Sequence, residues 1–296
     1  METILITGGT GLIGKALNEC LTAANYKVHI LTRTPKNEGE FAWDLKANTI
    51  DKRAFEGVSY IIHLAGAGIA DKKWTANRKK ELVDSRVHST KLLYQYVRDL
   101  EIPLKKFISA SGIGYYGSVT GNRVFQESDA PGNDFIANLC VAWEQAGHQF
   151  DNLSIPVSIF RTGVVLSKGG GALKKMNTPL VLNALGSGKQ ALPWIHIDDL
   201  CGLYLEAVRN ETLVGVFNAV APEKHSNHSF MQALARTLKK PLLPLNVPGF
   251  VLKLLLGELA SIVLEGSSIS AEKTQKHYPF KYPKLFTALD NLYRKN

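Results

Sequence analysis

A glycine-rich turn near the N-terminus carries the most specific chemistry in the sequence. Residues 8–14 read GGTGLIG, directly after the apolar segment Thr3–Thr7 and directly before residues with helical spacing. Gly8 would permit a tight turn, Gly11 would let a pyrophosphate approach the backbone, and Gly14 would let the helix pack closely against the sheet. The unpaired N–H groups at the start of the helix would then bind the anion. The motif predicts dinucleotide contacts from Gly8, Thr10, Gly11, Leu12, Ile13 and Gly14.

The end of the next apolar segment should contact the adenosine ribose. Val28–Leu31 is that segment, and Thr32 and Arg33 follow it where an acid would bind a free 2′-hydroxyl. Arg33 lies 19 residues beyond Gly14, close to the usual spacing. Its guanidinium would bind a 2′-phosphate through charge-assisted hydrogen bonds, whereas an acid would repel it. The pattern favours NADP(H) over NAD(H); the alternative is that Arg33 is a solvent-exposed loop cation.

The segments around these residues alternate between short apolar runs and amphipathic stretches. Such alternation predicts strands and helices in turn, and hence a parallel sheet with helices on both faces. We therefore expect an α/β fold, a doubly wound parallel sheet of the Rossmann type with a smaller C-terminal lobe. The expected strands after the first βαβ unit are Tyr60–Leu64, Phe107–Ala110 and Val157–Phe160, and the expected helices are Trp74–Leu100, Asn138–Phe150 and Leu200–Val208.

The texture of the chain changes in its second half, where glycine-rich loops and prolines become frequent. We interpret residues 1–166 as the dinucleotide-binding unit, with later strands contributed by the C-terminal half. Residues 167–296 would form the smaller lobe on the substrate side, with residues 247–296 as its distinctive C-terminal part. The apolar stretch Val247–Leu264 is interrupted by two charged residues, so we expect a packed amphipathic helix there and not a membrane span.

Short motifs follow one another in order along nearly the whole chain. They include HLAG at 63–66, SASGIGYYG at 109–117, FRTGVVL at 160–166 and WIHIDDL at 194–200. With these motifs the chain resembles the extended short-chain dehydrogenase/reductase superfamily, in particular an atypical NAD(P)-dependent epimerase/dehydratase-like subgroup with a C-terminal domain of unknown function. The small residues around Gly66 would let a second backbone stretch approach the cofactor. The resemblance implies further NADP contacts from Thr32, Arg33, Leu64, Ala65, Glu81, Arg86 and Val164.

The residues for proton transfer depart from the usual pattern of that superfamily. The resemblance implies a Tyr-x-x-x-Lys pair on a helix, in which the lysine makes the tyrosine a better acid. The matching segment, Phe135–Glu144, contains neither Tyr nor Lys. Candidate substitutes are Ser111, which would hydrogen-bond a carbonyl oxygen, and Tyr115 or Tyr116, which would act as the acid beside a suitable cation. The alternative is that these side chains only shape the pocket and position the nicotinamide.

Other residues that could suggest chemistry fit structural roles better. The His196–Asp199 segment lacks the spacing of a metal site, and no metal site is expected elsewhere. We expect this segment to tie the small lobe to the sheet, with an aspartate capping the next helix. Cys20, Cys140 and Cys201 are far apart and form no CxxC, which is typical of reduced thiols in a cytoplasmic protein. His63, at a strand end, is expected to be structural.

The charge of the chain gives no specific partner. The formal net charge is +9, but lysines and arginines are scattered, which indicates a solvated surface and not a nucleic-acid footprint. We expect a small-molecule substrate, no nucleic-acid or membrane partner, and a monomer or homodimer. Together the features predict an NADP(H)-dependent oxidoreductase or epimerase-like enzyme for an unknown small carbonyl, carbinol or sugar-nucleotide-like substrate. The alternative, which the missing Tyr/Lys pair favours, is a catalytically silent NADP(H)-binding regulatory module.

The assignment of Arg33 can be tested by charge reversal. We expect Arg33→Glu to lower the affinity for NADP far more than the affinity for NAD, because only NADP carries the 2′-phosphate that the guanidinium would bind. Calorimetric titration of both nucleotides into the wild-type and variant proteins measures this difference. Equal losses for the two nucleotides would show that Arg33 does not contact the 2′-phosphate.

Overall fold

One eight-stranded sheet forms the centre of the molecule. The computed structural model describes residues 1–293. The strand order is β11-β8-β6-β5-β1-β2-β3-β4, and all neighbours are parallel except β3 and β4. The expected doubly wound α/β sheet is therefore confirmed, and β11 comes from the second half of the chain. The strands are β1 Thr3–Thr7, β2 Lys27–Thr32, β3 Glu40–Asp44, β4 Thr49–Ile50, β5 Val58–His63, β6 Lys106–Gly112, β8 Val157–Thr162 and β11 Gly215–Ala219.

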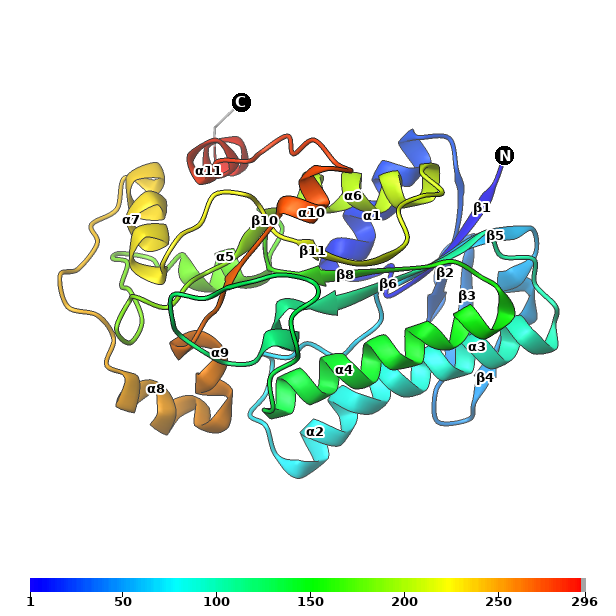
Figure 1. Cartoon of the computed structure of the whole chain (residues 1–296), viewed down its shortest axis with the longest axis horizontal. Coiled ribbons are helices and arrows are strands. Elements are labelled where there is room, and N and C mark those ends of the chain that lie inside the picture. The colour runs from blue at the N-terminus through cyan, green and yellow to red at the C-terminus, as the bar shows by residue number, and fades with distance from the viewer. Residues whose placement is uncertain (294–296) are drawn as a thin grey trace.

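Helices cover both faces of this sheet (Figure 1). All five residues of β1 are buried, and they divide between two cores. Ile4 and Ile6 belong to the core beneath α1 and α6, whereas Leu5 belongs to the core beneath α3. This alternation follows from the two-residue period of a strand, which sends successive side chains to opposite faces. The helices are α1 Leu12–Ala23 and α6 Ile197–Arg209 on one face, and α2 Ala76–Val83, α3 Ser89–Asp99 and α4 Phe135–Gly147 on the other.

The long helix expected over Trp74–Leu100 is present with an interruption. It begins at Ala76, because the Thr75 side chain accepts a hydrogen bond from the backbone N–H of Arg78 and caps the helix. Between α2 and α3, Asp84–His88 form one π-helical turn. Such single turns re-aim the side chains that follow them. This turn includes Arg86, one of the residues for which a cofactor contact is expected.

A smaller lobe packs at the carboxyl ends of the strands. Its own core joins α5, α7 and α11 to the short parallel pair β9 and β10. A second short pair, β7 with β12, connects the loop after β6 to the C-terminal part of the chain. The elements of this lobe and its connections are β7 Val124–Phe125, β9 Val164–Leu166, α5 Gly171–Met176, β10 Trp194–His196, α7 Asn227–Leu238, β12 Ser268–Ile269, α10 Glu272–Gln275 and α11 Leu285–Tyr293.

The prediction of a single packed helix over Val247–Leu264 is wrong. The structure divides this stretch into α8 Gly249–Leu256, a 3₁₀ turn at 257–260 and α9 Ser261–Leu264. The break falls at Gly257, whose φ of +62° is a left-handed conformation that ends a helix. No residue of α8 is fully buried, and several of its apolar side chains lie at the surface; Leu259 of the following turn is buried in a core cluster, against which Leu256 and Ile262 pack. Among residues 1–293, no helix is long and apolar enough to span a bilayer.

The prediction that an aspartate caps α6 is wrong, because the capping residue is a histidine. His196 is the N-cap, and its Nδ1 accepts the backbone N–H of Asp198 at 3.1 Å. The acids lie inside the first turn of the helix and not at the cap. The next residue, Asp199, is fully buried and accepts the backbone N–H groups of Lys281 at 2.6 Å and Tyr282 at 2.9 Å. The structure confirms that this segment ties the small lobe to the sheet.

Removal of the buried carboxylate should therefore loosen the small lobe. We expect Asp199→Ala to lower the free energy of unfolding by about 2–4 kcal/mol, because it leaves two buried N–H groups without acceptors. The matched control is Asp198→Ala, whose half-exposed side chain should contribute about 1 kcal/mol or less. Urea unfolding followed by circular dichroism compares the two. Equal losses would contradict the role given to Asp199.

Candidate functional site

The glycine turn has the geometry that an anion site requires. Gly8 adopts a φ of +70°, and its carbonyl accepts the backbone N–H of Gly11 at 3.0 Å. Gly11 is the N-cap of α1 and offers no side-chain cap, so the first N–H groups of the helix keep no side-chain acceptor. A Cβ on Gly14 would lie 2.3 Å from the Gly8 carbonyl oxygen. Gly14 is therefore required by the turn itself, and not by contact with the sheet as expected.

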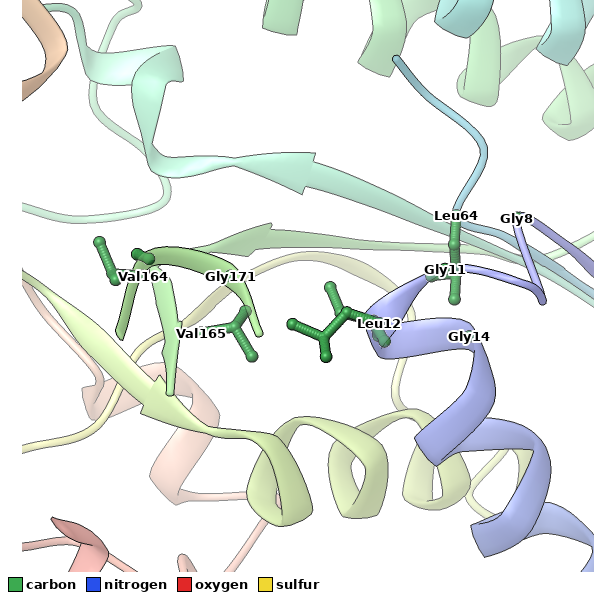
Figure 2. Close-up of a pocket in the computed structure, with 10 residues that line it drawn as sticks. Gly8, Gly11, Leu12, Gly14, Leu64, Val164, Val165 and Gly171 are labelled. Atoms are coloured by element: carbon green, nitrogen blue, oxygen red, sulfur yellow. The ribbon is translucent and has the colours of Figure 1, made fainter. Parts of the chain in front are cut away.

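A crevice of about 320 Å³ opens at this turn. Figure 2 shows Leu12 on α1 pointing across it toward Val165 and Gly171. The crevice fits a dinucleotide, since glycine backbone and unpaired N–H groups line the side that a pyrophosphate would approach. The expected residues that line it are Gly8, Gly11, Leu12, Ile13, Gly14, Leu64 and Val164; Thr10, an exposed residue, lies within the turn.

The opposite wall of the crevice contains residues that the sequence analysis missed. Val165, Gly171 and Ala172 line it beside Val164. A Cβ on Gly171 would lie 3.1 Å from a methyl group of Leu12, and Gly171 has a φ of +72°. The GGG run at 169–171 was the available signal, because consecutive glycines often mark a close approach of backbone to another group. The sequence by itself indicates only a loop of the small lobe for this GGG run.

A buried hydrogen-bond chain fixes the backbone at the end of β5. The Thr7 hydroxyl oxygen accepts the N–H groups of Leu64 at 3.2 Å and Ala65 at 3.1 Å, and it contacts His63 Nδ1 at 2.7 Å. His63 Nε2 lies 3.3 Å from the Ser89 hydroxyl. Burial lowers the pKa of His63 to about 3, so the ring is neutral and can accept from Thr7 through Nδ1. His63 is structural, as expected, and it positions two residues expected to contact the cofactor.

Charged side chains gather at the adenosine end. The pKa of the Glu81 carboxyl is lowered, chiefly by its hydrogen bond with Arg78 at 2.6 Å and also by the charges of Lys72 and Arg33. Arg33 therefore lies near enough to Glu81 for its charge to act there, although Arg33 follows β2 and Glu81 lies on α2. Arg33 and Glu81 are both exposed, as cofactor contacts from a loop and a helix would require. Their contacts with a nucleotide stay predictions.

Arg86 stabilises the loop after β5 through hydrogen bonds and close packing. Its guanidinium donates to the carbonyls of Ala67 at 3.0 Å and Leu82 at 3.2 Å, and it lies over the Trp143 ring. A Cβ on Gly66 would lie 2.8 Å from the guanidinium carbon. Burial lowers the pKa of Arg86 to about 10. The structure thus gives Arg86 internal partners and packs it against Gly66, and its expected contact with a cofactor stays a prediction.

Ser111, one of the two candidate catalytic residues, belongs to a buried polar network. Its hydroxyl donates to Glu144 at 2.7 Å, and Glu144 forms a two-pronged ion pair with Arg161 at 2.8 and 2.9 Å. Ser111 is 5 % exposed, and its only hydroxyl proton is used inside this network. In this arrangement Ser111 orients Glu144, and donation to a substrate oxygen would first require that bond to break.

The two neighbouring tyrosines have different surroundings. Tyr116 is buried, donates to Asn218 Oδ1 at 2.7 Å and accepts from Arg161 at 3.0 Å. Burial raises the pKa of Tyr116 to about 12, which makes it a poor acid near neutral pH. Tyr115 is only half-buried, and its hydroxyl forms no hydrogen bond with residues 1–293. Of the pair, Tyr115 alone has a hydroxyl left for a ligand.

Helix α4 contains no replacement for the missing Tyr/Lys pair. It begins at Phe135, where the Asp134 carboxylate accepts the backbone N–H of Ala137. Cys140, near the expected lysine position, is buried, and its pKa is raised to about 12 by desolvation and the charge of Glu144. A thiol in this state is a poor proton donor and nucleophile near neutral pH. All three cysteines are free, as expected.

Comparison with known proteins gives matches over nearly the whole chain. Residues 4–221 match the NAD dependent epimerase/dehydratase family, and residues 247–292 match a domain of unknown function, DUF1731. The chain is 37% identical over 262 residues to epimerase family protein Mb2239 of Mycobacterium bovis, covering 87% of this chain and 85% of that protein. It is 35% identical over 301 residues to the chloroplastic SDR39U1 homolog of Arabidopsis thaliana, covering 97% and 85%.

A solved structure shares the fold. The crystal structure of human epimerase family protein SDR39U1 (isoform 2) with NADPH superposes with a TM-score of 0.86 at 29% identity, covering 99% of this chain and 100% of that chain. The similarity extends over both the large sheet and the small lobe.

Two glycines of the turn should respond differently to one added methyl group. We expect Gly11→Ala to fold, because Gly11 has ordinary extended dihedrals and its new Cβ would meet only the Gly8 oxygen at 3.2 Å. The methyl should nevertheless lower dinucleotide affinity about tenfold or more, since it stands where the pyrophosphate approaches. Gly14→Ala should lower the free energy of unfolding by about 3 kcal/mol or more.

Thermal unfolding and NADPH fluorescence titration separate the two effects. A stable Gly11→Ala variant that keeps wild-type affinity would show that the nucleotide does not approach this backbone.

Proposed function

The chain belongs to the NAD dependent epimerase/dehydratase family, and from this premise we propose that it is an NADP(H)-dependent oxidoreductase or epimerase-like enzyme. The substrate would be a small carbonyl or carbinol compound or a sugar-nucleotide-like molecule. The observation that carries the proposal is the glycine-lined crevice at the start of α1, where unpaired N–H groups face open space. A diphosphate is the ligand that such a helix start binds best.

The preference for NADP(H) rests on the charges at the adenosine end. Arg33 stands after β2 where NAD-binding relatives of this fold carry an acid, and the field of Lys72 adds to it. The related human protein was solved with NADPH. A 2′-phosphate would gain from both cations, while Glu81 is already neutralised in part by its hydrogen bond with Arg78.

The residues of the chain would then hold the reactants in place. A bound nicotinamide supplies or accepts a hydride at its C4, and epimerisation would use the same step made and reversed on opposite faces of the substrate. Val164 would flank the nicotinamide, and the fixed backbone of Leu64 and Ala65 would keep the cofactor in register. Tyr115 would give a proton to the substrate oxygen, since its hydroxyl has no partner within residues 1–293.

The absence of the usual proton-transfer residues favours a second candidate function. Helix α4 has neither Tyr nor Lys, and the Ser111 proton is used by Glu144. A protein that binds NADP(H) without catalysis, and regulates a partner through cofactor occupancy, would keep the crevice and need no acid. The retained small lobe with its glycine-rich loops favours the enzyme instead, because a regulatory cofactor sensor has no need of a substrate side.

Cofactor binding is the first test of the proposal. We expect NADPH fluorescence to change on addition of the protein, with a dissociation constant at micromolar level or below. The absence of binding at these concentrations would overturn both candidate functions.

The role of Tyr115 as the proton donor can be tested with a matched pair of variants. NADPH oxidation should be screened with sugar nucleotides, quinones and carbonyl compounds. We expect Tyr115→Phe to lower kcat about 10²–10⁴-fold while NADPH affinity stays within about twofold, because the lost hydroxyl acts on the substrate and not on the cofactor. Tyr26→Phe, beyond the far end of α1, is the control and should retain activity. NADPH binding without turnover of any substrate would favour the regulatory module.

A further inference from the structure

Four of the five N–H groups of the Arg161 guanidinium donate hydrogen bonds to other described residues. Nε and Nη2 donate to the two carboxylate oxygens of Glu144 at 2.9 and 2.8 Å. Nη1 donates to the Tyr116 hydroxyl at 3.0 Å and to the Glu127 carbonyl at 3.1 Å. The side chain is 3 % exposed, so these bonds form without competition from water. These four bonds fix the orientation of the guanidinium, and its two flat faces remain for contacts with neighbouring rings.

One of those faces lies against the ring of Tyr115. The guanidinium carbon is 3.2 Å from the centre of the Tyr115 ring, compared with 5.1 Å from the centre of the Tyr116 ring. Burial alone would lower the pKa of Arg161, but the hydrogen bonds and charge of Glu144 outweigh burial and raise it, so the group stays a cation. Tyr115 is thus the one tyrosine of the pair that has a full positive charge on its ring face and a free hydroxyl.

The position of this stack links it to the cofactor crevice. Arg161 lies on β8, opposite Ser111 of β6, three residues before Val164 on the crevice wall. Val220 packs both on Gly163 and in the cluster that contains Tyr115. Tyr115 does not line the crevice itself, but Val220 links its cluster to the strand end that leads to Val164, which would flank the nicotinamide.

We propose that Arg161 is the positioning residue that replaces the missing lysine: its guanidinium, held by Glu144, stabilises the negative charge on the Tyr115 oxygen after that oxygen gives up its proton. The inference rests on the proposed function. In the reductive direction a nicotinamide hydride adds to the substrate carbonyl carbon, the carbonyl oxygen takes the bond's electron pair, and the Tyr115 O–H proton moves to it. The substrate is reduced, the cofactor is oxidised, and Tyr115 regains its proton from water.

Acids around the guanidinium limit the positive field that Arg161 presents to Tyr115. Glu144 partly cancels the charge of Arg161, and Tyr116 and the Glu127 segment contact the same guanidinium. Two further acids lie near this loop: Asp134 accepts the backbone N–H of Ser118, and the Glu127 carboxylate accepts the backbone N–H of Asn218 at 2.9 Å. Removal of the Glu144 charge should therefore expose Tyr115 to the whole field of the guanidinium, whereas removal of both charges should leave the phenol unassisted.

The experiment measures Tyr115 directly and needs no substrate. Tyrosinate absorbance is followed against pH in the full-length protein, and the Tyr115→Phe trace recorded in the same background is subtracted. We expect Glu144→Gln to move the Tyr115 transition to lower pH by about half to one pH unit, and Arg161→Met combined with Glu144→Gln to move it to higher pH by a similar amount. Lys106→Met removes a buried cation at the far end of β6 and should leave the transition unmoved.

The outcomes separate this inference from the proposed function. NADPH fluorescence titration of the same proteins reports on the crevice alone, so loss of NADPH binding in the wild-type protein would overturn the function without changing the tyrosine readout. A transition that stays in place in Glu144→Gln, or shifts the same way in both variants, overturns the role of Arg161. Thermal unfolding checks each variant, and if the double variant does not fold, the direction of the Glu144→Gln shift decides. Opposite shifts support the proposal, because a purely structural ion pair would not produce them.

Discussion

The structure depends on one local constraint: the first turn of α1 must leave its N–H groups uncapped and accessible. Many helices satisfy these N–H groups with a capping side chain, but Gly11 has none. Because Gly14 has no Cβ, the carbonyl oxygen of Gly8 can pack directly against its Cα. An uncapped helix start is costly unless an anion or water completes it. The surrounding elements keep the start of α1 accessible, line the crevice with glycine and apolar side chains, and hold it beside the carboxyl ends of the strands.

Two buried polar arrangements fix the ends of strands next to the crevice, and both lie against α4. Thr7, His63 and Ser89 tie the ends of β1 and β5 together through neutral hydrogen bonds, and so hold the backbone of Leu64 in place. Glu144 and Arg161 do the equivalent at the ends of α4 and β8 with a charged pair. The difference has a physical consequence. A neutral network only fixes geometry, whereas a buried ion pair also projects a field onto whatever packs against its open face, here the ring of Tyr115.

The small lobe completes the opposite wall and is attached at several points. The buried carboxylate of Asp199 receives backbone N–H groups from the C-terminal segment, and the glycines at 169–171 bring the chain against Leu12 of α1. In contrast α8 has no fully buried residue, and only its last residue, Leu256, packs against a core cluster. The lobe is thus attached firmly beside the crevice and packed less closely at α8.

The sequence by itself determined the α/β class, five strands of the main sheet (β1, β2, β5, β6 and β8) and the glycine turn at the start of α1, because each depends on local periodicity or on glycine at fixed spacing; it did not predict β3, β4 or β11. It missed the break at Gly257, since a continuous apolar run looks the same whether its side chains are packed or exposed. It assigned Ser111 and Tyr115 alike as candidates, because both lie in one short loop. Only the tertiary structure distinguished them: Glu144 and Arg161 are 33 and 46 residues further along the chain than Ser111 and Tyr115, and their contacts use the serine proton while leaving the tyrosine hydroxyl free. Such contacts between distant segments leave no periodic trace in the sequence, and packing alone decides which polar group keeps its proton for a ligand.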